Sequence, residues 1–284
     1  MSTTDYSILS RVFTRSVLRD IIQKGQSDIY NEAVAQFIVQ PESKTNGVNF
    51  DGLYAVLEKK YRNEYYYKNT LLNKLLLGVH SINTTTALTE LQTAHAKGDF
   101  ILINGKAVVY EIKTELDNFD RLDEQVYNYY KVFDHVSVVT CESNLSSLIQ
   151  RFYDSPVGVC SISPKGAIQH MKKAAEYKAA LNASDIFDTL RRQEYEEIIA
   201  KMKIPLPKVS SFDYYECCKN LISKQNINEV YALYLKILKA RAKINSELFY
   251  SVPKSIKSIS YFCNFSALEY KKLDYFLSHQ YERG

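Results

Sequence analysis

The chain has 284 residues, of which 46% are hydrophobic and 24% charged, and its formal net charge is +4. These values are typical of a soluble globular protein with one large or two small domains, and the mild positive charge permits nucleic-acid binding without arguing for it. The five cysteines are odd in number and include no Cys-x-x-Cys pair, which disfavours a disulfide framework and a zinc site. We find no pattern of a secretory leader and no apolar run of membrane-spanning length, so we expect a cytoplasmic protein without membrane contact.

The first predicted region, residues 1–50, is helical. Apolar residues recur at helical spacing through residues 8–22, and Ser27 is placed to cap a second helix that ends before Pro41. Residues 41–50 predict a turn-rich connection. Nothing in this region indicates chemistry.

A longer helical pattern covers residues 51–78 and ends at Gly78. Residues 84–93 are rich in β-branched side chains and predict a first strand. Two apolar runs then follow on either side of Asn104-Gly105, and this dipeptide is a strong hairpin signal. The sequence therefore predicts three consecutive antiparallel strands.

The register of this hairpin decides whether Asp99 and Glu111 share a face. A two-residue loop would pair Asp99 with Tyr110 and place it on the face opposite to Glu111. A three-residue loop, with Gly105 in the left-handed conformation, would pair Asp99 with Val109 or Glu111 and bring the carboxylates together. Both registers are open, and a joint site needs the second or a bulge elsewhere in the hairpin.

A helix is predicted over residues 121–133, and residues 135–140 form a short strand of the buried type. Because this strand follows a crossover helix, it should lie parallel to its partner. A helix over 143–154 and a small hairpin across Pro164-Lys165-Gly166 would extend the sheet.

Residues 171–284 are predicted to be helical, with a break at Pro205-Leu206-Pro207. This region contains a basic cluster of Lys236, Lys239, Arg241 and Lys243. Such a cluster on a helix is usually solvated, and contact with nucleic acid is the alternative. We accordingly divide the chain into a helical N-terminal region 1–50, a core 51–170 and a helical C-terminal region 171–284. The last is a candidate surface for a homodimer or a protein partner.

Three side chains of the predicted hairpin carry chemistry. Glu111 and Lys113 lie on one face of their strand, because strand side chains alternate, and Asp99 begins the neighbouring strand. Divalent-metal phosphodiester chemistry uses this set. Carboxylate oxygens hold Mg²⁺, and the ammonium orients a water or neutralises charge on the phosphate.

The arrangement Asp99-x11-Glu111-x-Lys113 resembles the PD-(D/E)XK nuclease superfamily, and Gln125-x-x-x-Tyr129 on the next helix is similar to an element of its RecB-like branch. The resemblance covers about residues 58–140. It implies an α/β fold, with an αβββαβ restriction-endonuclease-like core on a mixed sheet and helical N-terminal and C-terminal regions added.

The resemblance also implies a metal site. Asp99, Glu111 and the main-chain carbonyl of Ile112 would hold Mg²⁺ or Mn²⁺, and Lys113 would orient or help to deprotonate the attacking water.

On the following helix, Gln125 would hold a carboxylate or a metal-bound water. Tyr129 would brace the nucleic-acid backbone or the glutamine itself, and Arg121 would bind a phosphate. All three fall on one helix face, at i, i+4 and i+8.

Two further glutamates are candidates. The superfamily often carries an acidic residue on the helix before the first strand, where Glu64 lies, with Glu58 a weaker choice. Lys68 is one turn from Glu64, so a solvated ion pair is the alternative reading. Glu90, in the predicted first strand, is a secondary candidate.

The resulting hypothesis is metal-dependent hydrolysis of phosphodiester bonds, with DNA favoured over RNA. The alternative is a non-catalytic nucleic-acid-binding or partner-docking protein on the same fold, including one from a phage-defence or mobile-element system. Neighbouring carboxylates repel each other unless a cation is bound, which favours the enzyme. Strandedness, endo- or exonucleolytic action and sequence specificity stay open.

Overall fold

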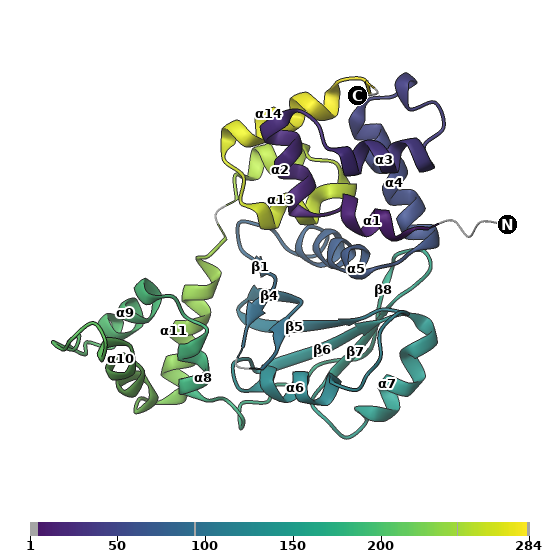
Figure 1. Ribbon diagram of the computed structural model, residues 1–284. Helices are drawn as coiled ribbons and strands as arrows, with labels where there is room; N and C mark the ends of the chain where they lie inside the picture. Colours follow the sequence, from purple (N-terminus) through teal and green to yellow (C-terminus); the bar gives the residue numbers. More distant parts are fainter. Residues whose placement is uncertain (1–4, 94, 243, 283–284) are drawn as a thin grey trace. The chain divides into compact units, whose positions relative to one another are not determined.

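The computed structural model describes residues 5–93, 95–242 and 244–282, which divide into two compact units (Figure 1). Unit 1 comprises Met1–Asn83 together with Lys243–Gly284, and unit 2 comprises the continuous segment Thr84–Ala242. No helix among the described residues is both long and apolar enough to span a lipid bilayer.

Unit 1 is helical, and its N-terminal and C-terminal segments share one interior. Apolar side chains at helical spacing turn inward from both segments, and the last helix, α14, contacts both α2 and α4. The helices are α1 (Ser7–Val12), α2 (Arg15–Lys24), α3 (Asp28–Phe37), α4 (Asn46–Lys60), α5 (Glu64–Leu71), α12 (Ser246–Ser251), α13 (Lys257–Cys263) and α14 (Ala267–Ser278), with the short 3-10 helices η1 (Pro41–Ser43) and η4 (Lys254–Ile256) and the π-helical turn η2 (Leu72–Leu76), which continues α5.

Unit 2 is built on a mixed sheet whose described residues form six strands in the order β1-β4-β5-β6-β7-β8. β4 is antiparallel to both β1 and β5, β6 is parallel to both β5 and β7, and β8 is antiparallel to β7. β2 and β3 pair separately. The strands are β1 (Thr86–Leu88), β2 (Leu91–Gln92), β3 (Lys97–Gly98), β4 (Phe100–Asn104), β5 (Lys106–Lys113), β6 (His135–Thr140), β7 (Gly158–Ile162) and β8 (Ile168–Lys172).

Two helices of unit 2, α6 and α7, cover one face of this sheet. α6 connects β5 to β6 and α7 connects β6 to β7, so right-handed crossovers place both on one face, and Figure 1 shows them beside these strands. Buried side chains of α8 to α11 extend the same apolar core. The helices are α6 (Leu122–Tyr130), α7 (Leu145–Arg151), α8 (Ala183–Asp188), α9 (Arg192–Lys201), α10 (Tyr214–Ser223) and α11 (Ile227–Lys239), with the short turn η3 (Glu142–Asn144).

The α/β class with a mixed sheet and flanking helices is confirmed. The β4–β5 hairpin, the strand after α6 and the β7–β8 hairpin all lie where the sequence predicts them. The hairpin has the register of the three-residue loop. Ile101 pairs with Val109 and Phe100 with Tyr110, so one further step puts Asp99 opposite Glu111. Gly105 has a φ of +72°, which glycine adopts without strain.

Several predicted boundaries are wrong. The strand predicted over residues 84–93 is divided between β1 and β2, because the chain turns at Glu90, whose φ is +58°. The helix predicted from residue 171 begins only at Ala183, since β8 continues to Lys172 by pairing with β7.

Two helix starts are displaced by side-chain caps. Thr45 accepts a hydrogen bond from the Val48 amide, so α4 begins inside the segment predicted to be a turn. Asn63 accepts one from the Tyr66 amide, which starts α5 anew and interrupts the helix predicted over 51–78.

The two units also differ in extent from the three predicted regions. The predicted boundary after residue 50 falls within α4, and the one after residue 170 falls within β8. Only residues 243–284 of the predicted C-terminal region join the N-terminal region in unit 1, where α14 packs on α2 and α4, whereas residues 171–242 belong to unit 2.

Candidate functional site

The candidate site lies where β5 faces α6. Val109, Glu111 and Lys113 alternate onto one face of β5, and Val109 is part of the apolar core that includes Leu122 and Val126 of α6. The polar end of this face therefore meets polar residues of the same helix.

The contacts between β5 and α6 form one network. The Tyr129 hydroxyl donates to Glu111 Oε2 at 2.6 Å, and Lys113 Nζ donates to Gln125 Oε1 at 2.9 Å. Lys113 Nζ also lies 3.0 Å from Glu111 Oε1. These contacts join all four residues of the predicted Glu-x-Lys and Gln-x-x-x-Tyr elements.

The Glu111–Lys113 ion pair is buried. The side chain of Glu111 is 1% exposed and that of Lys113 is 11% exposed. Removing two charges from water costs several kcal/mol per ion, roughly, and good geometry with further hydrogen bonds is needed to offset this. Tyr129 and Gln125 supply those hydrogen bonds.

Tyr129 links the network to the main chain before Asp99. Its fully buried side chain places the hydroxyl 2.9 Å from the Lys97 carbonyl as well as beside Glu111. Burial raises the pKa of Tyr129 far above its usual value, and the negative charges of Glu111 and Asp99 raise it further. Tyr129 therefore stays protonated, and both carboxylates lie close enough to act on it.

Asp99 directly precedes β4 and lies beside β5, one residue beyond the last residue pair of these two strands. Its Oδ2 accepts a hydrogen bond from the Ile112 amide at 2.8 Å, and its own carbonyl accepts one from the Thr89 hydroxyl at 2.7 Å. The amide and carbonyl of one strand residue point to the same neighbour. The Ile112 carbonyl therefore points to the same side of β5 as its amide, toward Asp99.

These donors suit a hard divalent cation. Mg²⁺ is usually held through one or two carboxylates, with waters completing its shell, and oxygen is its preferred ligand atom. Asp99, Glu111 and the Ile112 carbonyl are all oxygen donors. Among the residues that the structure describes, no group of three or more His, Cys, Asp or Glu side chains is arranged to hold a metal ion.

The structure places the other predicted residues as follows. Arg121 is exposed at the start of α6, and its carbonyl accepts the Gln125 amide at 2.9 Å. Glu64 belongs to unit 1, where its carboxylate pairs with Lys68 at 2.5 Å. A contribution of Glu64 to the metal site stays a prediction. Glu90 lies 3.0 Å from Lys97 Nζ on the surface of unit 2.

Sequence reasoning missed Lys97 and Thr89, which act here through a main-chain carbonyl and a hydroxyl. The Lys97 carbonyl accepts a hydrogen bond from the Tyr129 hydroxyl, and the Thr89 hydroxyl donates one to the Asp99 carbonyl. No residue pattern signals a main-chain acceptor, whereas the closeness of Thr89 and Lys97 to Asp99 in the sequence was a usable hint.

The predicted basic cluster is wrong at Arg241. Its guanidinium forms a two-bond ion pair with Glu194 at 2.6 and 2.7 Å, and the two side chains are 9% and 14% exposed. Lys236 and Lys239 are exposed, and Lys243 lies outside the described residues.

Replacing Tyr129 by phenylalanine should destabilise the protein by about 1–3 kcal/mol, because the buried Glu111 carboxylate, the nearer of the two acceptors of the single hydroxyl proton, loses its donor. Tyr130→Phe is the matched control on the same helix, since the buried Tyr130 hydroxyl has no hydrogen-bond partner among the described residues. Urea unfolding of both variants measures the difference. Equal stabilities would contradict a bonded role for the Tyr129 hydroxyl.

Comparison with known proteins places the chain in a family. The sequence profile of the family described as bacteriophage P4 protein cII matches residues 58–260, which include every residue of the network described above. The chain is also similar to protein cII of Enterobacteria phage P4, at 23% identity over 174 residues, covering 60% of this chain and 64% of that protein. No solved structure matches. The chain belongs to the bacteriophage P4 protein cII family.

Proposed function

We propose that the protein is a metal-dependent nuclease that hydrolyses phosphodiester bonds, with DNA as the favoured substrate. The observation that carries this proposal is the joint network of Glu111, Lys113, Gln125 and Tyr129, with Asp99 opposite Glu111. Within unit 2, the sheet strands β1, β4 and β5, followed by α6 and by β6 parallel to β5, have the order expected of the strands and second helix of an αβββαβ restriction-endonuclease-like core.

In this proposal Asp99, Glu111 and the Ile112 carbonyl hold the divalent cation. When bound, Mg²⁺ or Mn²⁺ supplies Lewis-acid stabilisation of the charge on the phosphate. The residues around it fix the ligands. Tyr129 holds Glu111, and the Ile112 amide holds Asp99.

Lys113 is positioned to act on the attacking water. An ammonium has three donors, and the contacts with Glu111 and Gln125 use two of them. The third is available to a water or a phosphate oxygen in the site. Because the lysine is held from two sides, its position costs little reorganisation during the reaction.

Cleavage of labelled linear and circular DNA, single- and double-stranded, tests the proposal. We expect cutting with Mg²⁺ or Mn²⁺, none with EDTA, and loss of cutting in Lys113→Ala. Cutting of the circular substrate would identify an endonuclease. Unchanged cleavage by Lys113→Ala would contradict the assignment, as would failure of the protein to cut any DNA or RNA.

Mg²⁺ or Mn²⁺ should also raise the Tm. A ligand present at a hundred times its Kd adds about 2.7 kcal/mol to folding stability, which corresponds to roughly 5 °C or more for a unit of this size. Asp99→Asn should remove the rise, since it halves the carboxylates available to the cation. KCl at matched ionic strength is the control. A metal-induced rise that persists in Asp99→Asn would place the cation elsewhere.

A further inference from the structure

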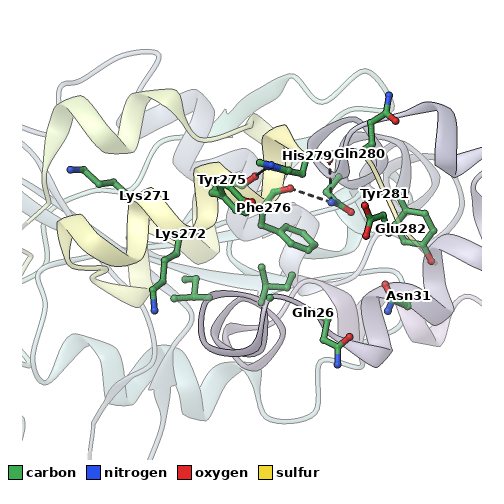
Figure 2. A pocket seen from close by; sticks show the side chains of 14 residues that line it. Gln26, Asn31, Lys271, Lys272, Tyr275, Phe276, His279, Gln280, Tyr281 and Glu282 are labelled. Atoms are coloured by element: carbon green, nitrogen blue, oxygen red, sulfur yellow. Dashed lines mark hydrogen bonds between the residues drawn. The ribbon is translucent and has the colours of Figure 1, made fainter. Parts of the chain in front are cut away.

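Unit 1 contains a cavity of about 700 Å³, bounded by α2, the start of α3, α14 and the segment that follows α14 (Figure 2). Small-molecule sites usually have volumes of about 300–1,000 Å³. Its lining residues lie outside the segment matched by the family, residues 58–260. The cavity is also separate in sequence from the network on β5 and α6.

One wall of this cavity is held rigidly. Asn46 is 5% exposed, and its amide donates to the carbonyls of Phe276 and His279 at 3.1 and 3.2 Å. The Tyr30 hydroxyl donates to the Asn46 side-chain oxygen at 2.9 Å. The Tyr281 amide donates to the Lys44 carbonyl at 3.0 Å. The segment after α14 is therefore fixed before any ligand arrives, which lowers the cost of binding.

The lining combines an apolar surface with side-chain amides. Ile21 and Ile22 of α2 and Phe276 of α14 supply apolar contact for a flat ring. Gln26 and Asn31 also line the cavity, and neither side-chain amide has a hydrogen-bond partner among the described residues. An amide offers a donor and an acceptor side by side, which is the pattern that the edge of a nucleobase accepts.

Charge is distributed unevenly around the cavity. Figure 2 shows Lys271 and Lys272 on one side of Phe276, and Asn31 and Glu282 on the other. Neither lysine forms an ion pair within the described part of the chain. Two unpaired ammonium groups favour a phosphate, whereas a carboxylate on the far side of Phe276 is an acceptor for the exocyclic amino group of a base.

We propose that this cavity binds a nucleotide, with its phosphate at Lys271 and Lys272 and its base against Phe276 and the amides of Gln26 and Asn31. The nucleotide is either a free nucleoside monophosphate or the terminal unit of a single strand, since both present the same base, sugar and phosphate. The proposal goes beyond the nuclease assignment and does not depend on it.

Isothermal titration with EDTA present tests the site without cleavage. The probes are the four ribonucleoside and four deoxyribonucleoside monophosphates, the nucleosides, inorganic phosphate and a 5′-phosphorylated single strand. The variants are Lys271→Ala/Lys272→Ala and Asn31→Ala. Lys24→Ala is the control, because Lys24 is an exposed lysine of α2 that pairs with Asp20 and does not line the cavity.

We expect at least one monophosphate or the phosphorylated strand to bind, with about tenfold or greater loss in the double lysine variant and in Asn31→Ala, and no change in Lys24→Ala. Binding of the monophosphate identifies a free nucleotide, and binding of the strand alone identifies a strand end. Absence of binding by all of these probes at millimolar concentration would overturn the proposal. Inorganic phosphate binding as tightly as the nucleotides would also overturn it, as would affinities that the cavity variants leave unchanged.

Discussion

Replacing Glu111 by glutamine is expected to lower the proposed metal-dependent cleavage at least about a hundredfold, which is the usual loss when one charge-stabilising group is removed from a reaction site. Glutamine keeps the length of the side chain and accepts a hydrogen bond from Tyr129, but it loses the negative charge that the proposed cation site requires. Initial rates on labelled DNA, measured with saturating Mn²⁺, give the ratio.

Glu115→Gln is the matched control for this experiment. Glu115 follows the same strand two residues after Lys113, but it is exposed and lies beyond the end of β5. Its substitution should leave cleavage within about twofold, because single surface changes away from a site have small effects. Equal losses in both variants would contradict the placement of the metal ligands.

The stability of the Glu111 variant must be separated from its activity. Glu111→Gln leaves Lys113 buried without its carboxylate, and breaking a buried pair costs about 3–5 kcal/mol. The double variant Glu111→Gln/Lys113→Met removes both charges, so it should recover most of that stability while remaining inactive. Recovery of cleavage in the double variant would rule out both residues as catalytic groups.

Glu194→Ala is expected to destabilise the protein by about 3 kcal/mol, since Arg241 stays 9% exposed and charged without its partner. Such a loss lowers the Tm by roughly 6–12 °C for a unit of this size. Glu197→Ala on the same helix is the control. It removes an exposed pair with Lys201, with side chains 45% and 50% exposed, and should cost less than about 1 kcal/mol.

The Glu194–Arg241 ion pair also predicts that the folding stability of the protein depends on pH. Burial alone would raise the pKa of Glu194, but hydrogen bonds from Arg241 and from the Arg191 amide lower it overall. The unfolded chain therefore binds the proton more tightly than the folded one. This stability is present above the ordinary glutamate pKa near 4.5 and is lost as the pH falls through the lower folded value. Glu194→Ala should lose less stability than the wild type as the pH falls from about 5 to about 3, and an identical loss would contradict this account.

Local patterns in the sequence predict the core of unit 2 well. Asn104-Gly105 predicts the hairpin, and the buried-type run after α6 predicts β6 in full. The register was open because Gly105 is compatible with either loop length. The structure has the register that sets Asp99 opposite Glu111.

Long-range contacts explain what the sequence did not reveal. Arg241 looks like one more exposed lysine or arginine of a basic helix, yet Glu194, on a different helix, makes it part of the interior. The association of α14 with α2 likewise depends on residues far apart in the chain. Periodicity shows that a helix has an apolar face but does not show which partner covers it.

The discontinuous make-up of unit 1 sets an order of folding during synthesis. Unit 2 is one continuous segment, so it can fold as soon as residue 242 has left the ribosome, whereas the N-terminal helices lack the surface of α14 that completes their interior. At about 5–20 residues per second, they remain incomplete for on the order of ten to forty seconds. In nascent chains halted before Ala267, a protease should therefore cleave α2 and α4 while the sheet of unit 2 is already resistant.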